Sequence, residues 1–256
     1  IVTYEIDQKY GTDYHERFKQ FLVYLQDYNL VTIGGMTDVK GDRSKKADQQ
    51  RDPDLFVHVV AEREDGVVVR GAKAHLTGVS GAHELMVFPT ENMKEDAKDY
   101  AVVFSCPVNT PGITYIFGRQ TNDGRKLDTE HPIDQGNFKY ACVGGECIAV
   151  FDDVFIPWKD VYMYKEYEFA GMFVEAFATA HRQNYGACKG GIADVLLGAT
   201  YGICKVNGVE RVGHVRDKMA DMINLTETLY AGSIACSYEG RPTPSGAWRA
   251  DTMLAN

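Results

Sequence analysis

A histidine and a cysteine stand seven residues apart, at His181 and Cys188, in a helix-compatible stretch. On an α-helix, seven steps return to within about 20° of the starting direction and climb about 10 Å, so the two side chains share one face. Tyr185 lies between them on that face, and the cationic Lys189 follows. Small residues leave room nearby: Gly186, Ala187, Gly190 and Gly191. These side chains could hold a metal or a cluster against a bound ligand.

The same spacing also fits a core histidine and a buried, inert thiol, because Cys is among the residue types most often buried. The other cysteines form neither a CxxC pair nor a dense disulfide framework: Cys106, Cys142, Cys147, Cys204 and Cys236. Cys142 and Cys147 flank Glu146 at a spacing that fits no zinc knuckle, so we expect them to be strand cysteines. We expect core packing for the remaining three and a reducing compartment for the protein.

Composition narrows the class of protein. The 256 residues are 45% hydrophobic and 25% charged, enough for one large or two medium domains with real cores. The net charge of -9 and the scattered basic residues argue against a nucleic-acid partner. The sequence has no apolar run of membrane-spanning length and nothing that resembles a signal peptide, so we expect a cytoplasmic protein without a membrane partner.

The chain starts at Ile1 rather than Met, and both of its ends look helical. We therefore expect an internal piece of a longer polypeptide, from which some ligands of a site are missing.

Three zones of periodicity must position these residues. Apolar residues recur at helical spacing over residues 12–30, where Thr12 or Asp13 can cap the helix. Residues 55–161 contain short β-branched and aromatic runs separated by turn residues, which is typical of an antiparallel β domain. Helical periodicity returns from Glu166, most clearly over residues 214–236, and Gly202, Gly208 and Gly213 punctuate these helices.

The strands that we expect in the middle zone lie at residues 56–61, 67–70, 85–88, 100–104, 113–117 and 138–155, with a hairpin turn at Asp65-Gly66. The order of helix, β domain and helices predicts an α+β protein in which a small barrel or sandwich lies between helical layers.

The run FDDVFIPW at residues 151–158 resembles the end of the middle β domain in acyl-CoA dehydrogenase-like flavoproteins, which share this order of elements. The resemblance implies an antiparallel β-barrel between helical domains. It divides the chain into residues 1–32, 33–162 and 163–256, with parts of both end domains missing. Without the resemblance, Asp152 and Asp153 read as an ordinary turn; a metal pair there is not favoured.

Two further segments narrow the resemblance: TDVKGDRS at residues 37–44 and GAKAHLTG at residues 71–78. Both look like flavin-contact segments of the group that joins 4-hydroxyphenylacetate 3-monooxygenases with 4-hydroxybutyryl-CoA dehydratases. A loop of this composition offers backbone donors and a cation to a diphosphate, and a threonine hydroxyl can bond the isoalloxazine ring. The resemblance implies FAD contacts from Met36, Thr37, Asp38, Val39, Lys40, Gly41, Asp42, Arg43, His75, Leu76, Thr77 and Gly78. A surface turn and an ordinary hairpin are the alternatives.

His181 and Cys188 distinguish the two branches of that group. The monooxygenases need no metal, whereas the dehydratase branch is similar to this chain in having a His and a Cys at this spacing as ligands of a [4Fe-4S] cluster. The resemblance places two further cysteine ligands a few residues upstream of Ile1. A histidine ligand is unusual in such a cluster and changes the electronics of its iron.

The dehydratase branch implies conversion of 4-hydroxybutyryl-CoA to crotonyl-CoA, with vinylacetyl-CoA isomerisation. There the flavin acts as a transient electron store and the cluster as a Lewis acid. His181 is the implied cluster ligand and base, Tyr185 a proton donor or relay, Lys189 a stabiliser of charge and Glu146 an acid near the substrate. A CoA-thioester substrate and a homotetramer are also implied.

The alternatives for the whole protein are an FAD-dependent aromatic hydroxylase, which makes His181 and Cys188 incidental, and a non-catalytic subunit that serves assembly. Glu146 reads equally well as a solvated strand residue. His75 is expected near the flavin, whereas His83 and His131 are ambiguous and His214 is expected to be structural.

Overall fold

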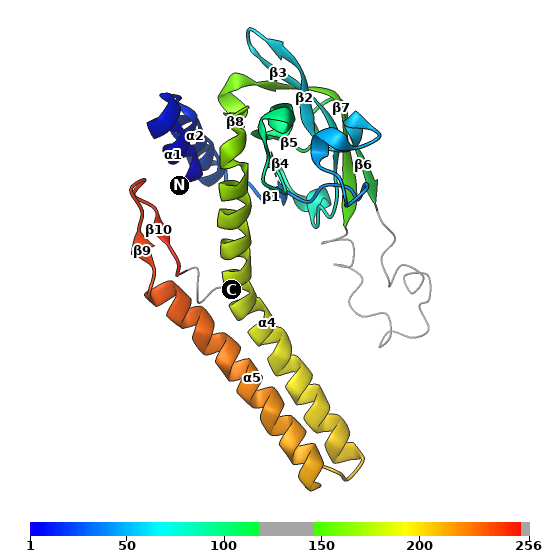
Figure 1. Ribbon diagram of the computed structural model, residues 1–256. Coiled ribbons are helices and arrows are strands. Elements are labelled where there is room, and N and C mark those ends of the chain that lie inside the picture. Colours follow the sequence, from blue (N-terminus) through cyan, green and yellow to red (C-terminus); the bar gives the residue numbers. More distant parts are fainter. Residues whose placement is uncertain (118–145, 252–256) are drawn as a thin grey trace. The chain divides into compact units, whose positions relative to one another are not determined.

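The computed structural model describes residues 1–117 and 146–251 (Figure 1). The chain forms two compact units, Val2–Val174 and Glu175–Asn256, the second together with Ile1.

The first unit begins with two helices, α1 (Val2–Tyr10) and α2 (Tyr14–Asp27). The helix expected over residues 12–30 is therefore confirmed in a shorter form. On α2, the rings of Phe18 and Phe21 lie 5.5 and 5.9 Å from the buried ring of Tyr162, between ring centroids. This aromatic contact fixes the apolar face of α2 against strand β8 (Val161–Tyr164).

The cap of α2 differs from the prediction. Asp13 occupies the N-cap position without a capping hydrogen bond, and its carboxylate instead pairs with Arg17 at 2.6 Å. The carboxylate of Asp7, on α1, accepts hydrogen bonds from the backbone N–H groups of Tyr14 at 3.0 Å and His15 at 2.9 Å. Two of the orphan donors of α2 are thus satisfied by the preceding helix rather than by the side chains of Thr12 or Asp13.

One sheet has the order β1-β4-β5-β8, with β1 at Thr32–Gly35, β4 at Glu84–Val87 and β5 at Val102–Pro107. The β4-β5 and β5-β8 pairs are antiparallel, but β1 and β4 are parallel. The prediction of a wholly antiparallel β domain is therefore wrong at this pair, because alternation along a strand does not reveal the direction of its neighbour.

The second sheet has the order β2-β3-β7-β6 and is antiparallel throughout. Its strands are β2 (His58–Arg63), β3 (Gly66–Lys73), β7 (Cys147–Pro157) and β6 (Ile113–Phe117). The Asp65-Gly66 hairpin is confirmed, since Arg63 pairs with Gly66. The strand expected over residues 138–155 is β7 from Cys147 onward, and its earlier part lies outside the described residues.

A small irregularity in β7 replaces the turn that Asp152 and Asp153 could have formed. The register between β3 and β7 shifts between Val69 and Gly71, opposite these aspartates, and Asp153 has a φ of 52°. The Asp153 carboxylate accepts hydrogen bonds from the Arg70 guanidinium at 2.8 and 3.0 Å. The two aspartates therefore belong to a β-bulge in the β3-β7 ladder.

The inner faces of both sheets share one apolar core, in which the rings of Phe104 and Phe151 meet edge to face at 5.9 Å. The fully buried side chains of this core include Val67, Val69, Leu85, Ile156 and Val161. Within residues 1–117 and 146–251, the strands form two four-stranded sheets and a two-stranded hairpin. The predicted closed barrel is not confirmed.

Two long helices, α4 (Ala170–Val206) and α5 (Gly213–Tyr238), confirm the helical zone expected from Glu166 onward. Gly208, with a φ of 69°, follows the end of α4, and Gly213 opens α5, but Gly202 lies inside α4. The prediction that the C-terminal end of the chain is helical is wrong for residues 241–249. Strands β9 (Arg241–Pro242) and β10 (Trp248–Arg249) form a hairpin there.

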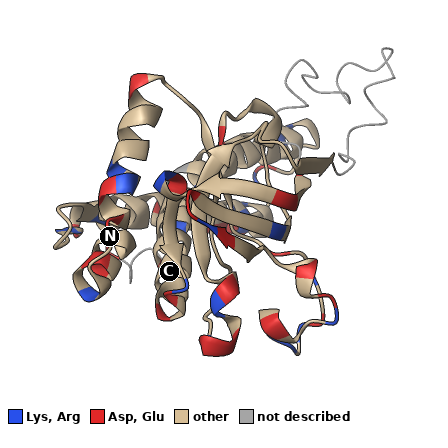
Figure 2. Ribbon diagram, turned by 90° about the horizontal axis from the view of Figure 1, so that it is seen from above, with Lys and Arg blue, Asp and Glu red and all other residues tan. Residues whose placement is uncertain are grey.

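Lysine and arginine are interspersed with aspartate and glutamate along the described elements in the view of Figure 2. Among the described helices, none combines the length and the apolar character that a membrane span requires.

Candidate functional site

The loop that follows β1 carries the first segment with flavin-like composition. Each oxygen of the Asp38 carboxylate has a side-chain partner. Oδ1 lies 2.5 Å from Nζ of Lys73, and Oδ2 lies 2.6 Å from the hydroxyl of Thr90. The backbone N–H of Asp38 donates to the same Thr90 hydroxyl at 3.1 Å. The side chain of Asp38 is thus engaged with Lys73 and Thr90.

The rest of this loop closes on the side chain of Gln50, whose Oε1 accepts a hydrogen bond from the N–H of Asp42 at 2.9 Å. The hydroxyl and backbone N–H of Ser44 donate to Asp42, and these hydrogen bonds lower the pKa of the Asp42 carboxyl. Within the described ranges, the backbone N–H groups of Lys40, Gly41 and Arg43 have no hydrogen-bond acceptor. The Arg43 side chain is exposed. Free N–H groups beside a guanidinium fit a diphosphate, so the donor set suits the flavin that the family resemblance implies.

The second segment follows β3 and turns sharply. His75 has a φ of 58°, and its ring Nδ1 lies 3.0 Å from Oε2 of Glu146. The hydroxyl of Thr77 donates to the other oxygen of Glu146 at 3.4 Å. All three side chains lie at the surface, and the structure thereby brings together two residues of the expected flavin site and one expected near the substrate.

Leu76 has a different role from its neighbours. Its side chain is fully buried in the apolar core, and its backbone N–H donates to the carbonyl of Cys147 at 3.1 Å. Any contact of Leu76 with a flavin is therefore limited to its backbone. Gly78 has a φ of 84° and no atom within 4 Å of the place that a Cβ would occupy.

In the second unit, α4 runs without interruption through His181, Tyr185, Cys188 and Lys189. The rings of His181 and Tyr185 lie 4.6 Å apart between centroids, and Nζ of Lys189 lies 5.1 Å from the centroid of Tyr185. The His181 ring also stacks on Phe177 at 5.5 Å. The predicted helical stripe is confirmed as a geometric arrangement, and its imidazole, phenol and thiol groups are exposed.

A tight helix contact occupies part of the space expected around the thiol. A Cβ added at Gly186 would collide with the side chain of Ser233 on α5. Gln183 and Ser237 reinforce the contact with a hydrogen bond of 2.7 Å. Gly186 therefore lets α4 and α5 approach each other. At Gly190 and Gly191, by contrast, no atom lies within 4 Å of the place that a Cβ would occupy, so these glycines leave room.

His181 and Cys188 provide an imidazole and a thiol, which are donor types that an iron–sulfur cluster can take. Among residues 1–117 and 146–251, no group of three or more His, Cys, Asp or Glu side chains could hold a metal ion by itself. The donor types fit the expected cluster, but the described residues alone do not complete its ligand set.

The other cysteines behave as expected where they are described. Cys106, Cys147 and Cys236 are buried and Cys204 is half-buried; burial raises the pKa of Cys106 to about 12. Cys142 and His131 lie outside the described residues. The ring Nδ1 of His83 accepts a hydrogen bond from the backbone of Val31 at 3.1 Å, which is a structural role.

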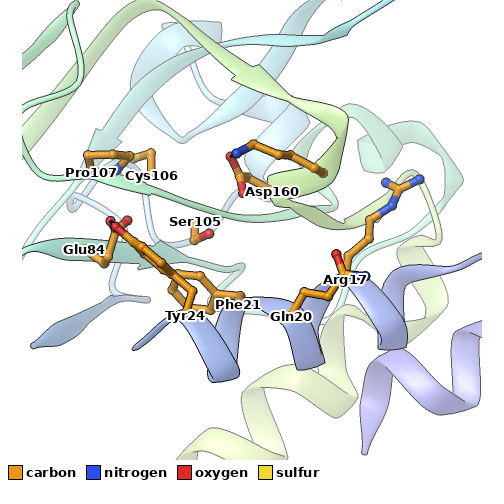
Figure 3. A pocket seen from close by; sticks show the side chains of 10 residues that line it. Arg17, Gln20, Phe21, Tyr24, Glu84, Ser105, Cys106, Pro107 and Asp160 are labelled. Atoms are coloured by element: carbon orange, nitrogen blue, oxygen red, sulfur yellow. Dashed lines mark hydrogen bonds and ion pairs between the residues drawn. The ribbon is translucent and has the colours of Figure 1, made fainter. Parts of the chain in front are cut away.

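A cavity of about 290 Å³ opens between α2 and the sheet that contains β4 and β5 (Figure 3). Its polar lining includes Arg17, Tyr24, Glu84, Ser105 and Asp160. Burial raises the pKa of both Glu84 and Asp160. Because β1 and β4 are parallel and Glu84 opens β4, this cavity lies at the opposite end of the sheet from Met36. It contains none of the predicted site residues.

The sequence alone did not indicate a role for Thr90. It also did not distinguish Lys73 from the other residues of the segment 71–78. Thr90 carries no pattern signal. Lys73 does carry one, because it continues the alternate positions Val67, Val69 and Gly71 that point into the core. A lysine at an inward position needs buried acceptors, and Asp38 is one of them.

Comparison with known proteins shows the family to which the chain belongs. A family model for the N-terminal part of 4-hydroxyphenylacetate 3-hydroxylase matches residues 1–163, and the model for the C-terminal part matches residues 170–256. The chain belongs to this 4-hydroxyphenylacetate 3-hydroxylase family. It spans about half the length of the curated relatives it matches.

Within the hydroxylase family, the chain is similar to both branches. It is 50% identical over 99% of its length to the 4-hydroxybutyryl-CoA dehydratase/vinylacetyl-CoA-Δ-isomerase of Clostridium aminobutyricum, covering 51% of that protein. An oxygen-tolerant archaeal 4-hydroxybutyryl-CoA dehydratase from N. maritimus matches with a TM-score of 0.90 and 46% identity, over 99% of this chain and 50% of the other. The oxygenase component of 4-hydroxyphenylacetate 3-monooxygenase, solved with FAD, matches with a TM-score of 0.84 and 25% identity over 99% and 52% of the two chains.

The fold is mixed helix and strand with acyl-CoA dehydrogenase-like neighbours. Butyryl-CoA dehydrogenase from Megasphaera elsdenii matches with a TM-score of 0.60 over 97% of this chain and 57% of the other. At 18% identity this likeness concerns the fold alone.

Proposed function

We propose that the protein containing this chain dehydrates 4-hydroxybutyryl-CoA to crotonyl-CoA and water, and isomerises vinylacetyl-CoA. The observation that carries the proposal is the 50% identity to the clostridial dehydratase/isomerase, against 27% to a monooxygenase component from Thermus thermophilus. The His181 and Cys188 pair supports the same branch. Both reactions are redox-neutral overall.

FAD is the proposed flavin. The free N–H groups of Lys40, Gly41 and Arg43 would hold its diphosphate, and the Thr77 hydroxyl would bond its ring. When bound, the flavin supplies a reversible electron acceptor, which matters because an unactivated C–H bond β to a thioester is too weak an acid for an ordinary base. Support comes from the family neighbour that was solved with FAD and from the chemistry of the loop.

His181 and Cys188 are the proposed ligands that this chain gives to a [4Fe-4S] cluster. When bound, the cluster supplies a Lewis acid for the γ-hydroxyl of the substrate. The exposed imidazole and thiol on one helical face support this assignment.

The remaining polar side chains have proposed roles in proton transfer. His181 would accept a substrate proton when its ring nitrogen is released from iron, and Tyr185, one helical turn away, would donate or relay a proton. The ammonium of Lys189 stabilises negative charge on the enolate or the departing hydroxyl. The carboxyl of Glu146 exchanges a proton near the substrate, held by His75 and Thr77.

We also propose a homotetramer, a cytoplasmic location and the three-domain division at residues 1–32, 33–162 and 163–256. Apolar side chains of α4 and α5 are more than half exposed in this chain, and are available for contact with another subunit or with the rest of the polypeptide: Val195, Leu196, Ile203, Val206 and Leu225. Extended apolar surface of this kind is typical of protein interfaces.

An anaerobic assay tests the function. The purified full-length protein is incubated with 4-hydroxybutyryl-CoA, and crotonyl-CoA is measured together with bound FAD, iron and acid-labile sulfide. We expect crotonyl-CoA to form without an added electron donor. Hydroxylation of 4-hydroxyphenylacetate with reduced flavin and O₂, in the absence of any dehydration, would overturn the proposal.

A further inference from the structure

Lys73 is a cation enclosed at the end of β3, with a side chain only 3% exposed. Its Nζ donates to the Asp38 carboxylate at 2.5 Å and to the carbonyls of Met36 and Phe88, both at 3.0 Å. An ammonium group has three N–H donors, so all of them are used. Burial lowers the pKa of Lys73, and the Asp38 carboxylate opposes that shift.

The acceptors of Lys73 lie on two separate segments, with Met36 and Asp38 on one and Phe88 on the other. Thr90, two residues after Phe88, links the same two segments again. The Thr90 hydroxyl lies 2.5 Å from the carbonyl of Met36 and 2.6 Å from Oδ2 of Asp38. Both oxygens of the Asp38 carboxylate therefore have partners. Lys73, Asp38 and Thr90 form one closed polar cluster, which we call the Lys73 cluster.

The Lys73 cluster sits between the two segments that the proposed function assigns to the flavin. Asp38 belongs to the first segment, and Lys73 lies just before the second group of flavin residues, at 75–78. The backbones meet at the same point, because Asp38 and Lys73 form an antiparallel bridge and the N–H of Ala74 donates to the carbonyl of Thr37 at 2.7 Å. The position of one segment is thereby fixed against the other.

We propose that Lys73, Asp38 and Thr90 are positioning residues that hold the two flavin segments in register. This inference rests on the proposed function. The side chain of Asp38 acts on the flavin through the position of its loop. The contacts to the flavin come from the free N–H groups of Lys40, Gly41 and Arg43 and from Thr77.

Replacing one or both partners of a buried ion pair has different effects on stability, and this difference can distinguish a positioning role from a merely structural one. Removing one partner of such a pair leaves an uncompensated buried charge and is strongly destabilising, whereas replacing both partners with apolar residues is often neutral or stabilising. The directional hydrogen bonds are lost in either case. A double variant can therefore keep the fold while it releases the loop.

The test compares Lys73→Met, Asp38→Leu, the double variant and Thr90→Val in the full-length protein. The melting temperature of the flavin-free protein, the FAD dissociation constant and the reduction potential of bound flavin are measured for each. We expect both single variants at the ion pair to melt earlier and to bind FAD at least tenfold more weakly. The double variant should recover most of the melting temperature, yet still bind FAD at least tenfold more weakly, with a shifted potential.

Two controls keep the test decisive. Thr90→Val removes one hydroxyl and keeps the ion pair of Lys73 with Asp38, so it should lower the melting temperature less than either single variant at the ion pair and weaken FAD binding at least threefold. Lys165→Met removes a partly exposed lysine that pairs with Glu62 and Asp99, and should leave all three quantities unchanged.

A double variant and a Thr90→Val variant that both keep the wild-type FAD affinity and potential would overturn the inference, leaving Lys73 a merely structural residue. If the wild-type protein binds no FAD at all, the proposed function and this inference both fail. Because the first result requires a wild-type protein that binds FAD, the two failures are distinguishable.

Discussion

The ring Nδ1 of His75 lies 3.0 Å from Oε2 of Glu146, although 71 residues separate them in the chain. Strand pairing brings them together, since β3 and β7 are antiparallel neighbours and Lys73 pairs with Ala149. The end of β3 therefore lies beside the start of β7, and the turn at His75 directs its ring toward the carboxylate. This contact places Glu146 within reach of Thr77.

Glu146→Gln tests whether this carboxyl takes part in the chemistry. The amide keeps the size and much of the hydrogen bonding of the side chain but cannot exchange a proton. We expect turnover to fall at least tenfold, about 1.4 kcal/mol of barrier, with FAD and iron retained. Glu64→Gln, an exposed glutamate in the β2-β3 hairpin, is the matched control. Equal rates in both variants would leave Glu146 a solvated residue just before β7.

Tyr185→Phe and Lys189→Gln test the polar groups that follow His181 on α4. Each removes a proton donor or a charge while leaving a helix-compatible side chain. We expect each to lower turnover at least tenfold without loss of FAD or iron, measured anaerobically with cofactor content determined on the same sample. Near-normal rates in both would assign these side chains to packing.

Thr77→Ala tests the flavin contact. Loss of the hydroxyl should weaken FAD binding or shift the potential of the bound flavin, because a hydrogen bond to the ring changes its electronics. The melting temperature should stay close to that of the wild type, since the side chain is exposed. Thr77→Ser retains the hydroxyl and should restore both quantities. The assignment fails if the alanine variant binds and turns over like the wild type.

Cys188→Ser and His181→Ala test the cluster. Both should lower iron and acid-labile sulfide per subunit, Cys188→Ser more severely because a thiolate is the usual ligand of such clusters. Dehydration should disappear together with iron, even where FAD remains bound. Cys204→Ser, another cysteine on α4, should keep full iron. Full iron in both ligand variants, or full activity without iron, contradicts the cluster assignment.

Glu84→Gln should stabilise the fold in a pH-dependent way. Burial raises the pKa of Glu84 above its ordinary value of 4.5, despite a hydrogen bond from the Tyr24 hydroxyl at 3.2 Å. A raised pKa contributes stability that is fully present below 4.5 and is lost as the pH rises through the folded pKa. The neutral amide avoids this loss.

The melting temperature of Glu84→Gln should therefore exceed that of the wild type at about pH 8, and the difference should vanish by about pH 4. Glu95→Gln, an exposed glutamate, controls for the general effect of removing a charge. A difference that is the same at both pH values would contradict the buried-carboxyl explanation.

The sequence by itself determined the elements and the family. The Asp65-Gly66 hairpin, strand β6 and the helix through His181 and Cys188 depend on turn chemistry and on side-chain periodicity, which act over a few residues and can be read along the chain. The flavin-like segments were recognisable for the same reason, because each is a contiguous stretch.

Only the tertiary structure decided which of these pieces meet. The parallel pairing of β1 with β4, the cap that Asp7 provides to α2 and the contact of Gly186 with Ser233 all join separate segments. The Lys73 cluster is the clearest case. A lysine at an inward position signals that buried acceptors must exist, but their identity depends on backbone carbonyls and on Thr90, which have no sequence signature. Local rules specify elements, whereas burial and hydrogen bonding across the core select their partners.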